Sequence, residues 1–417
     1  MTFSKMSRII TALVATAALG LGMTACGGGT IGYMWVLGTF YSQISAFKID
    51  DFTGNLTPTL KSPFSSGGTN PVSIVVKPGG RFVYVINTGA LGVGTDPKAS
   101  GYVAPVQGTI AEFSVGGGGT LTYQQSFFSQ GKFPLWATLD SSGNFIYVLD
   151  KFAPDYDALK NPTGSITAFS IASDTGRLTL VPNTSTLIAG IPQTFFRVGA
   201  NPIMAKVGTG NCLYTLSPQS ITPYAVSGSN GQLTTVATGD YQVPNAVSLT
   251  SINTSNSSYA YVTDGGGNQI FALQSPGTGC SLSPVTGGGL QANLPGTANP
   301  VNSLTSSSGK FLWVLNQSST ANNQTIANSS ISAFLVNTNG QISLLADGTN
   351  NPYAVGAGPV CLAQDPTNQY LYISNNTDGT VTGKLADQIH GYLSNLQHGS
   401  VFPVSMKPTC LVVSGAI

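Results

Sequence analysis

Seven strand-like segments of one form recur along this chain of 417 residues, and their number and spacing predict an all-β fold, a seven-bladed β-propeller. Each segment reads aromatic-x-Tyr-Val-x-Asn/Asp or a close variant, and most follow a short apolar run that opens at a proline or an asparagine. Repeats of about 40 residues or more with several strands each are typical of propellers, because one blade cannot bury its faces alone. The segments begin at Tyr33, Phe82, Phe145, Cys212, Tyr259, Phe311 and Tyr370.

The remaining strands have patterns of their own and predict four strands per blade, with the segments above as second strands. First strands open at Pro71, Pro134, Pro202, Asn245, Pro300, Pro359 and Pro408. Third strands read Ile-x-Ala-Phe or a variant and begin at Ile44, Thr109, Ser165, Ile221, Gln269, Ser330 and Gln388. Fourth strands follow a turn and begin with Leu or Ile, in motifs that start at Gly54, Gly119, Gly176, Gly231, Cys280 and Gly340, with Ser400–Val404 as the candidate in blade seven.

The order of these strands predicts how the ring closes. The propeller, residues 31–417, starts on a second strand at Tyr33 and ends on a first strand at Thr409–Val413. The C-terminal strand should therefore complete the blade that the N-terminal strands begin. This closure removes the free sheet edge that would otherwise invite aggregation.

Composition and motifs exclude several classes of protein. Charged residues make up 7% of the chain and the net charge is +1, so there is no electrostatic reason to expect a nucleic-acid partner. Apolar residues make up 41%, in strand spacing, which argues against disorder. The sequence has no C-x-x-C, Walker, G-x-S-x-G or H-E-x-x-H motif, and we expect a monomer without metal or cofactor.

The N-terminus has the form of an export signal, to which we assign residues 1–25. Lys5 and Arg8 provide the basic part, and Ile9–Met23 is an apolar segment that is short for a membrane span. We therefore expect this segment to be removed rather than to form part of the fold.

The end of the signal resembles a bacterial lipobox, Met-Thr-Ala-Cys, in which Cys26 is lipidated and becomes the new N-terminus. Residues 26–30 would then be the lipidated cysteine and a short tether. Gly27 is not an aspartate, which resembles lipoproteins that are not retained at the inner membrane. We expect a membrane partner through this anchor, in the outer membrane or periplasm of the cell envelope. The alternative is an ordinary secretory signal with an incidental cysteine.

Four further cysteines lie in the exported part, where oxidising conditions permit disulfides. Cys361 and Cys410 each follow by two residues the proline that opens a first strand, in blades that should be adjacent. A disulfide between them would hold the ring at its closure. Cys212 and Cys280 also fall in adjacent blades and are the second candidate pair.

The Tyr-Val-x-Asn strand, the Ile-Ser-Ala-Phe strand and the Gly-x-Leu-Thr-Pro strand together resemble the seven-bladed lactonase family, whose repeat is called YVTN. Members include propellers of the 6-phosphogluconolactonase type. The resemblance covers about residues 31–417 and implies hydrolysis of a lactone, a small-molecule ring ester. It also implies His, Arg and acidic groups near the mouth of the channel, and no such His can be assigned here.

Candidate site residues are sought on the face of a propeller that carries the second-to-third loops and the fourth-to-first connections. Asp150 ends a second strand there and is the candidate general base of a lactonase. Arg197, in the loop 191–200, is the candidate partner of an anionic substrate. Gln193, Phe195 and Phe196 would add a polar group and an apolar wall, although a surface Arg stacked on Phe is the simpler interpretation.

Other charged residues on this face are weaker candidates for binding. Lys132 precedes the first strand of blade three, and Asp155 and Asp157 could bind a cation through paired carboxylates, or form a solvated turn. His390 replaces a residue of the third-strand pattern, and His398 falls in a third-to-fourth connection on the opposite face.

Two functions therefore remain open. One is a lactone hydrolase with Asp150 as base and Arg197 as anchor. The other is a non-enzymatic module that binds a glycan, peptide or protein of the cell envelope, which the scarcity of acid–base groups favours.

Overall fold

The computed structural model describes residues 29–415 apart from 91–105, 184–185, 209–210, 237–238, 254–256, 277–278, 286–289, 294–298, 318–319, 322–323, 326–328, 348–349 and 405–406. The predicted signal and Cys26 lie outside the described residues. No helix in the described part is long and apolar enough to cross a membrane.

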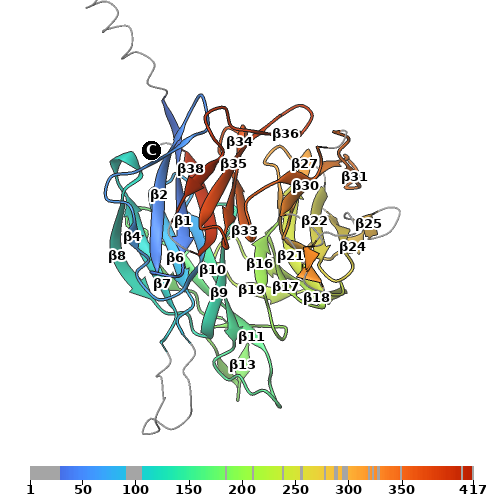
Figure 1. The fold of residues 1–417 in the computed structure, drawn as a ribbon. Helices are drawn as coiled ribbons and strands as arrows, with labels where there is room; N and C mark the ends of the chain where they lie inside the picture. Colours follow the sequence, from blue (N-terminus) through green and yellow to red (C-terminus); the bar gives the residue numbers. More distant parts are fainter. Residues whose placement is uncertain are drawn as a thin grey trace, which may run out of the picture.

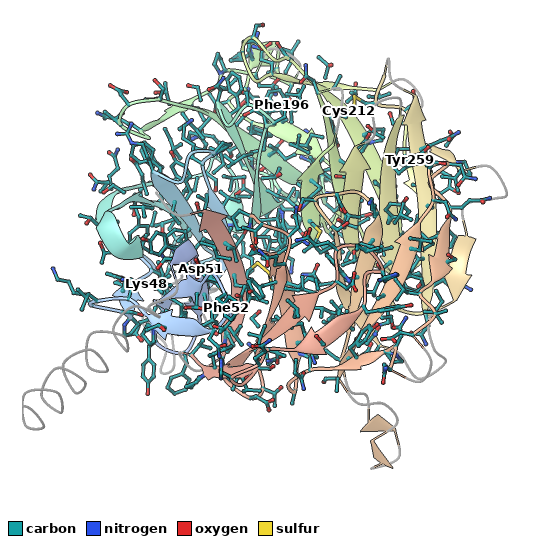
Figure 2. The ribbon with its side chains drawn as sticks, turned by 90° about the horizontal axis from the view of Figure 1, so that it is seen from above. Lys48, Asp51, Phe52, Phe196, Cys212 and Tyr259 are labelled. Atoms are coloured by element: carbon teal, nitrogen blue, oxygen red, sulfur yellow. A yellow bond between two sulfur atoms is a disulfide. The ribbon has the colours of Figure 1, made fainter. Side chains whose placement is uncertain are left out.

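Seven antiparallel sheets, one for each blade, stand around a central channel, which confirms the predicted seven-bladed propeller (Figures 1 and 2). From the channel outward, blade one contains β38 (Pro408–Gly415), β1 (Thr30–Gly38), β2 (Gln43–Asp50) and β3 (Leu56–Pro58). Blade two contains β5 (Pro71–Val76), β6 (Phe82–Asn87), β7 (Thr109–Val115) and β8 (Leu121–Phe127), with the 3₁₀ turn η1 (Gly117–Gly119). Blade three contains β9 (Lys132–Leu139), β10 (Phe145–Phe152), β11 (Gly164–Ile171) and β12 (Leu178–Leu180).

The other four blades repeat this order. Blade four contains β16 (Met204–Val207), β17 (Cys212–Ser217), β18 (Ser220–Val226) and β19 (Leu233–Thr235). Blade five contains β21 (Ala246–Asn253), β22 (Ser257–Asp264), β23 (Gln269–Pro276) and β24 (Ser283–Pro284). Blade six contains β26 (Pro300–Thr305), β27 (Phe311–Asn316), β30 (Ser330–Val336) and β31 (Ile342–Leu344). Blade seven contains β33 (Pro359–Gln364), β34 (Tyr370–Asn375), β35 (Thr380–Ala386) and β36 (Leu393–Asn395).

The outermost strand is interrupted in six of the blades, which the sequence did not indicate. A second short strand pairs with the other half of the third strand, so the fourth strand has two parts. These second parts are β4 (Phe64–Ser65), β15 (Phe196–Val198), β20 (Tyr241–Gln242), β25 (Leu290–Asn293), β32 (Tyr353–Ala354) and β37 (Val401–Pro403). Two small hairpins complete the strands: β13 (Leu187–Ile188) with β14 (Ile191–Pro192), and β28 (Thr320–Ala321) with β29 (Gln324–Thr325).

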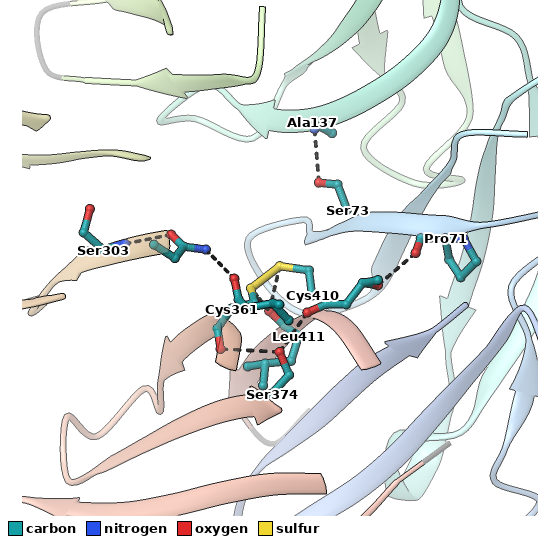
Figure 3. Close-up of a disulfide and its surroundings, with 11 residues drawn as sticks. Pro71, Ser73, Ala137, Ser303, Cys361, Ser374, Cys410 and Leu411 are labelled. Carbon is teal, nitrogen blue, oxygen red and sulfur yellow. Dashed lines mark hydrogen bonds between the residues drawn. A yellow bond between two sulfur atoms is a disulfide. The ribbon is translucent and has the colours of Figure 1, made fainter. Parts of the chain in front are cut away.

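The ring closes as predicted, because the last strand pairs with the first. In β38, Val412 lies opposite Trp35 and Leu411 opposite Val36 of β1. Cys410 of β38 is joined to Cys361 of β33 in blade seven, with Cα atoms 5.1 Å apart (Figure 3). Both connections tie the two ends of the blade array together.

Five pairs of neighbouring blades share one repeated contact, which we call the interblade latch. An aromatic side chain in the second strand donates a hydrogen bond to the carbonyl of a turn glycine in the next blade, as from Tyr147 Oη to Gly231 (3.1 Å). The ring two residues earlier in the same strand, here Phe145, covers the same glycine, where an added Cβ would lie 2.4 Å from that ring. The bond recurs from Trp35 to Gly119, Tyr84 to Gly176, Tyr261 to Gly340 and Tyr372 to Gly54.

The two ends of the ring differ in what they carry. The loop face carries the second-to-third connections, such as Gly38–Gln43, and the turn face carries the third-to-fourth turns, such as Asp50–Leu56. The described chain enters at the turn face, where the amide of Asp51 donates to the carbonyl of Gly29 (3.0 Å). The loop face is therefore the end opposite the point of entry.

Blade seven corrects the sequence analysis. The third strand is β35, not the segment that begins at Gln388, so only four residues join it to β34. The pattern was missed because Gly383 and Lys384 replace its Ala and Phe. Leu396 and Phe402 pack where a side chain at Gly383 would lie. The predicted fourth strand, Ser400–Val404, contains β37, which is only the second part of that strand.

We predict that deleting residues 408–417 removes the cooperative fold. The deletion takes away the inner strand of blade one and, with Cys410, a disulfide across 49 residues that stabilises by about 4 kcal/mol in the chain-entropy estimate. Thermal unfolding followed by circular dichroism measures the effect. The Cys361→Ser/Cys410→Ser double variant, which keeps the strand, should lose less than the deletion. Equal losses in the two variants would show that the strand itself adds nothing.

Candidate functional site

The loop face contains a pocket between blades two and three, with a volume of about 320 Å³, which we call the blade-two/three pocket. One wall comes from the β6–β7 connection and the other from the start of β9 and the end of β10. Thr88 joins the walls, because its hydroxyl donates to the carbonyl of Pro134 (2.9 Å). The described lining residues are Thr88, Ala90, Val106, Gln107, Gly108, Gly131, Lys132, Phe133, Pro134 and Phe152.

This pocket combines aromatic surfaces with positive charge. Lys132 lines it and is exposed. The ammonium of Lys151 lies 5.9 Å from the ring centre of Phe133 and 5.4 Å from that of Phe152, both of which line the pocket. Cations in this position are held by the electron-rich face of the ring. The site therefore suits an anion that has a flat or apolar part.

Asp150 lies beneath the pocket and not in it. Its carboxylate is fully buried and accepts hydrogen bonds from the amide of Gly131 (3.3 Å) and the hydroxyls of Ser165 (3.3 Å) and Thr167 (3.1 Å). Burial raises the pKa of Asp150 to about 7, while these bonds and one from Ser129 act in the opposite direction. Gly131 separates the carboxylate from the cavity, and an added Cβ there would lie 2.5 Å from the Cβ of Asp150.

The strand position that Asp150 occupies has a structural role in several blades. Asn87, Asn316 and Asn375 occupy the same strand end and are also buried. Each of these amides donates to a hydroxyl of its third strand, as Asn375 does to Thr382 (2.9 Å). An asparagine cannot act as a base, so the shared role of this position is to join the second and third strands.

Arg197 lies in a strand, which corrects its assignment to a loop. It is in β15, at the outer edge of blade three, while the channel is lined by the inner strands. Its guanidinium forms an ion pair with Asp155, donates to the hydroxyl of Thr163 and stacks over the ring of Phe195. Arg197 and Asp150 both lie opposite Ser165, on either side of β11, and are thus roughly 10 Å apart between strands.

The neighbours of Arg197 do not form a wall around a ligand. Phe195 and Phe196 are buried, and Phe196 packs in the core between blades three and four (Figure 2). Gln193 is half-buried, and its side-chain amide donates to the carbonyl of Ile191 (2.8 Å) in the hairpin strand β14. These contacts stabilise the blade edge.

Asp155 and Asp157 point to different partners. Asp155 pairs with Arg197, and Asp157 accepts from the amides of Leu159 and Lys160, which lower its pKa. Asp157 is thus part of a solvated turn, the second of the two interpretations that the sequence left open. Among the described residues, no three His, Cys, Asp or Glu side chains are grouped so that they could hold a metal ion.

The two histidines lie away from the pocket. His390 is exposed in the turn between β35 and β36, where it pairs with Asp387 (3.2 Å), so its expected place in a third strand is wrong. His398 lies between β36 and β37, and its carbonyl accepts from the side chain of Asn55 (3.3 Å).

The sequence analysis proposed Lys132 as a binding residue but did not assign Lys151, Phe133 or Phe152 to the site. The available signal was a Lys-Phe dipeptide that occurs twice, as Lys132-Phe133 at the start of one strand and as Lys151-Phe152 at the end of the next. Phe152 lies opposite Lys132 in the register of β9 and β10. That pairing brings both dipeptides to one place.

Comparison with known proteins agrees with the fold and with the expected resemblance. Residues 30–156 match the model of the lactonase family, described as a seven-bladed beta-propeller. No curated protein matches the chain.

Solved structures resemble almost the whole chain at low identity. The periplasmic gluconolactonase PpgL of Pseudomonas aeruginosa is 15% identical with a TM-score of 0.66, over 93% of this chain and 100% of that one. A Bacteroides fragilis protein proposed to be a 6-phosphogluconolactonase is 18% identical with a TM-score of 0.65, over 92% and 98%. A Lactobacillus plantarum protein is 16% identical with a TM-score of 0.66, over 93% and 100%. At these identities the likeness shows the lactonase-type propeller fold.

We predict that Asp150→Asn stabilises the protein above neutral pH. The folded-state pKa of about 7 lies above the ordinary value of 3.8, so the folded chain binds this proton more tightly than the unfolded chain. Stability from Asp150 is then fully present below about pH 4 and lost as the pH rises through 7. At pH 8 the gain in the variant should reach up to about 4 kcal/mol, at about 1.4 kcal/mol per pKa unit.

Urea unfolding between pH 4 and pH 8 measures this difference. Asp264→Asn is the matched control, because Asp264 ends the second strand of blade five but accepts from the amides of Gly266 and Gly267. That variant should gain no stability at pH 8. A wild-type protein whose stability does not fall relative to Asp150→Asn between pH 4 and pH 8 would contradict the prediction.

Proposed function

We propose that this protein is a lactonase-type propeller of the cell envelope that binds a small anionic lactone in the blade-two/three pocket and opens its ring with water. The observation that carries this proposal is the pair of lysines, Lys132 and Lys151, beside the rings of Phe133 and Phe152. The family match over residues 30–156, which includes both walls of the pocket, supports the choice of substrate class.

The lysines have two tasks in this proposal. One ammonium pairs with the carboxylate of the substrate, and the other stabilises the negative charge that develops on the ring carbonyl oxygen. Water adds to the carbonyl carbon, the ring C–O bond breaks, and the product is an open-chain hydroxy carboxylate, with one proton released to solvent. The rings of Phe133 and Phe152 cover the apolar side of the lactone.

A non-enzymatic binding module is the second candidate, and one observation favours it. None of the described residues that line the pocket is a carboxylate or an imidazole, and the carboxyl of Asp150 is sealed beneath Gly131. In this case the pocket would hold an anionic group of an envelope glycan, peptide or protein without changing it.

Attachment to the membrane through Cys26 is part of the proposal. Four peptide units separate Cys26 from Thr30 and span at most roughly 14 Å. The described chain enters at the turn face, so a lipid on Cys26 would hold that face near the bilayer. The pocket, on the loop face, would then be open to the surrounding compartment.

Ring opening is tested on the full chain carrying Cys26→Ser, with a pH indicator and a panel of lactones with and without a carboxylate. We expect turnover of the carboxylated lactones. The Lys132→Ala/Lys151→Met variant should lower kcat/KM at least about 10-fold, which corresponds to 1.4 kcal/mol. Arg197→Ala is the matched control and should keep wild-type kcat/KM, because that guanidinium is engaged by Asp155.

Other outcomes of this assay distinguish the lactone hydrolase from the binding module. Binding of carboxylated lactones without turnover, weakened by the double lysine variant, would support the binding module. Turnover that falls with Arg197→Ala and not with the lysine variant would place the site at the edge of blade three. Neither binding nor turnover across the panel would contradict both uses of the pocket.

The anchor is tested by expression in a bacterium with radiolabelled palmitate. We expect the wild-type chain to carry the label and to sediment with membranes, and the Cys26→Ser chain to be unlabelled and soluble after lysis. An unlabelled, soluble wild-type chain would leave the alternative of an ordinary secretory signal.

A further inference from the structure

The central channel contains a second cavity, with a volume of about 430 Å³. All seven inner strands contribute to its lining, mainly with the halves that lead to the turn face, and the Cys361–Cys410 disulfide lines it as well (Figure 3). It shares no described lining residue with the blade-two/three pocket. We call it the channel cavity.

Lys206 of β16 is the one charged residue among the described residues that line the channel cavity. Its side chain is half-buried, and its ammonium forms neither an ion pair nor a hydrogen bond with any described residue. The strands that pack against β16 are β9, β17 and β21, and none of them contains an acidic residue. Burial without a partner lowers the pKa of Lys206.

The other blades show that the fold does not need a lysine at this position. Lys206 lies opposite Tyr214, the latch-position aromatic residue of its blade. At the same register the other six blades have uncharged side chains: Val412, Val75, Thr138, Thr250, Leu304 and Ala363. A cation here costs desolvation energy that none of the equivalent positions incurs. That cost is offset if an anion binds beside it.

Three other polar groups of the lining already have hydrogen-bond partners. Ser73 accepts from the amide of Ala137 (3.2 Å), Ser303 bonds Ser248 (2.7 Å), and Thr305 donates to the carbonyl of Ser251 (2.8 Å). Thr138, one blade from Lys206 at the equivalent position, lines the cavity, and its hydroxyl bonds no residue in the described part of the chain. The groups of the lining that remain available to a ligand thus include an ammonium and a hydroxyl of the neighbouring blade.

Apolar side chains make up much of the remaining wall. Among them are Val76, Leu139, Leu304 and Val413, which come from four different blades. A ligand with a single charge at one end and an apolar body matches this arrangement. A strongly charged or fully polar ligand would leave the apolar wall in contact with polar groups.

We propose that the channel cavity is a binding site for a small organic carboxylate with an apolar body, whose carboxylate pairs with the ammonium of Lys206. This site is independent of the proposed lactone pocket. It would therefore be present whether or not the protein hydrolyses lactones.

The test uses hexanoate as the probe, with 1-hexanol and hexylamine as neutral and cationic probes of the same length. Titration calorimetry on the Cys26→Ser chain at pH 7 should show tighter binding of hexanoate than of 1-hexanol and no binding of hexylamine. Lys206→Met, which keeps the volume and removes the charge, should weaken hexanoate at least 10-fold and leave 1-hexanol unchanged. Lys384→Met is the matched control, a second buried lysine that already pairs with Asn395 (2.7 Å) away from the channel.

The proposal is overturned if hexanoate does not bind the wild-type chain, or if it binds wild type and Lys206→Met with equal affinity. The pH dependence of hexanoate binding to the wild-type chain is a further test, which needs no variant. Hexanoate affinity should fall as the pH rises through the lowered pKa of Lys206, while hexanoate itself stays ionised. Affinity that stays constant from pH 6 to the ordinary lysine pKa of about 10.4 would also overturn it.

Discussion

The ring depends on the interblade latch, in which an aromatic side chain of one blade bonds and covers a turn glycine of the next. A buried Tyr or Trp needs a partner for its polar atom, and the glycine carbonyl provides it at the same place in successive blades. Only glycine fits, because the backbone has positive φ, as at Gly231 (φ 72°), and the aromatic ring occupies the space of a Cβ. Five pairs of neighbouring blades are positioned in this way, whereas the buried indole N–H of Trp313 in blade six bonds none of the described residues.

The two disulfides also join neighbouring blades. In blade four, Cys212 takes the strand position that holds the covering aromatic elsewhere, and Cys280 takes the place of the turn glycine in blade five. A covalent bond with Cα atoms 5.4 Å apart thus replaces one packing contact of the latch. The second disulfide lies at the inner strands, where the two ends of the chain meet. Both pairs that the sequence suggested are present in the structure.

The residues that best indicate function are those that differ from the equivalent residues of the other blades. Lys206 stands where the other blades have uncharged residues, and Lys132 and Lys151 stand beside a pocket that two particular blades form. Asp150 is a smaller departure, a carboxyl at a position that joins strands through asparagine in three other blades. A repeated residue is explained by the architecture, whereas an unrepeated charge in a buried place needs a ligand or carries a cost in stability.

The sequence by itself determined the class of fold, the number of blades and the closure of the ring by the last strand. These follow from local patterns, since strand residues and turn glycines recur at a fixed spacing in each repeat. It failed locally in blade seven, where Gly383 replaces the expected alanine and residues from the outer strand fill the space. Only the tertiary structure decided that Asp150 is sealed, that Arg197 is neutralised by Asp155, and that Lys206 is the one charged group among the described residues that line the channel cavity. The reason is physical: burial and charge pairing depend on side chains from segments far apart in the chain, which no local pattern contains.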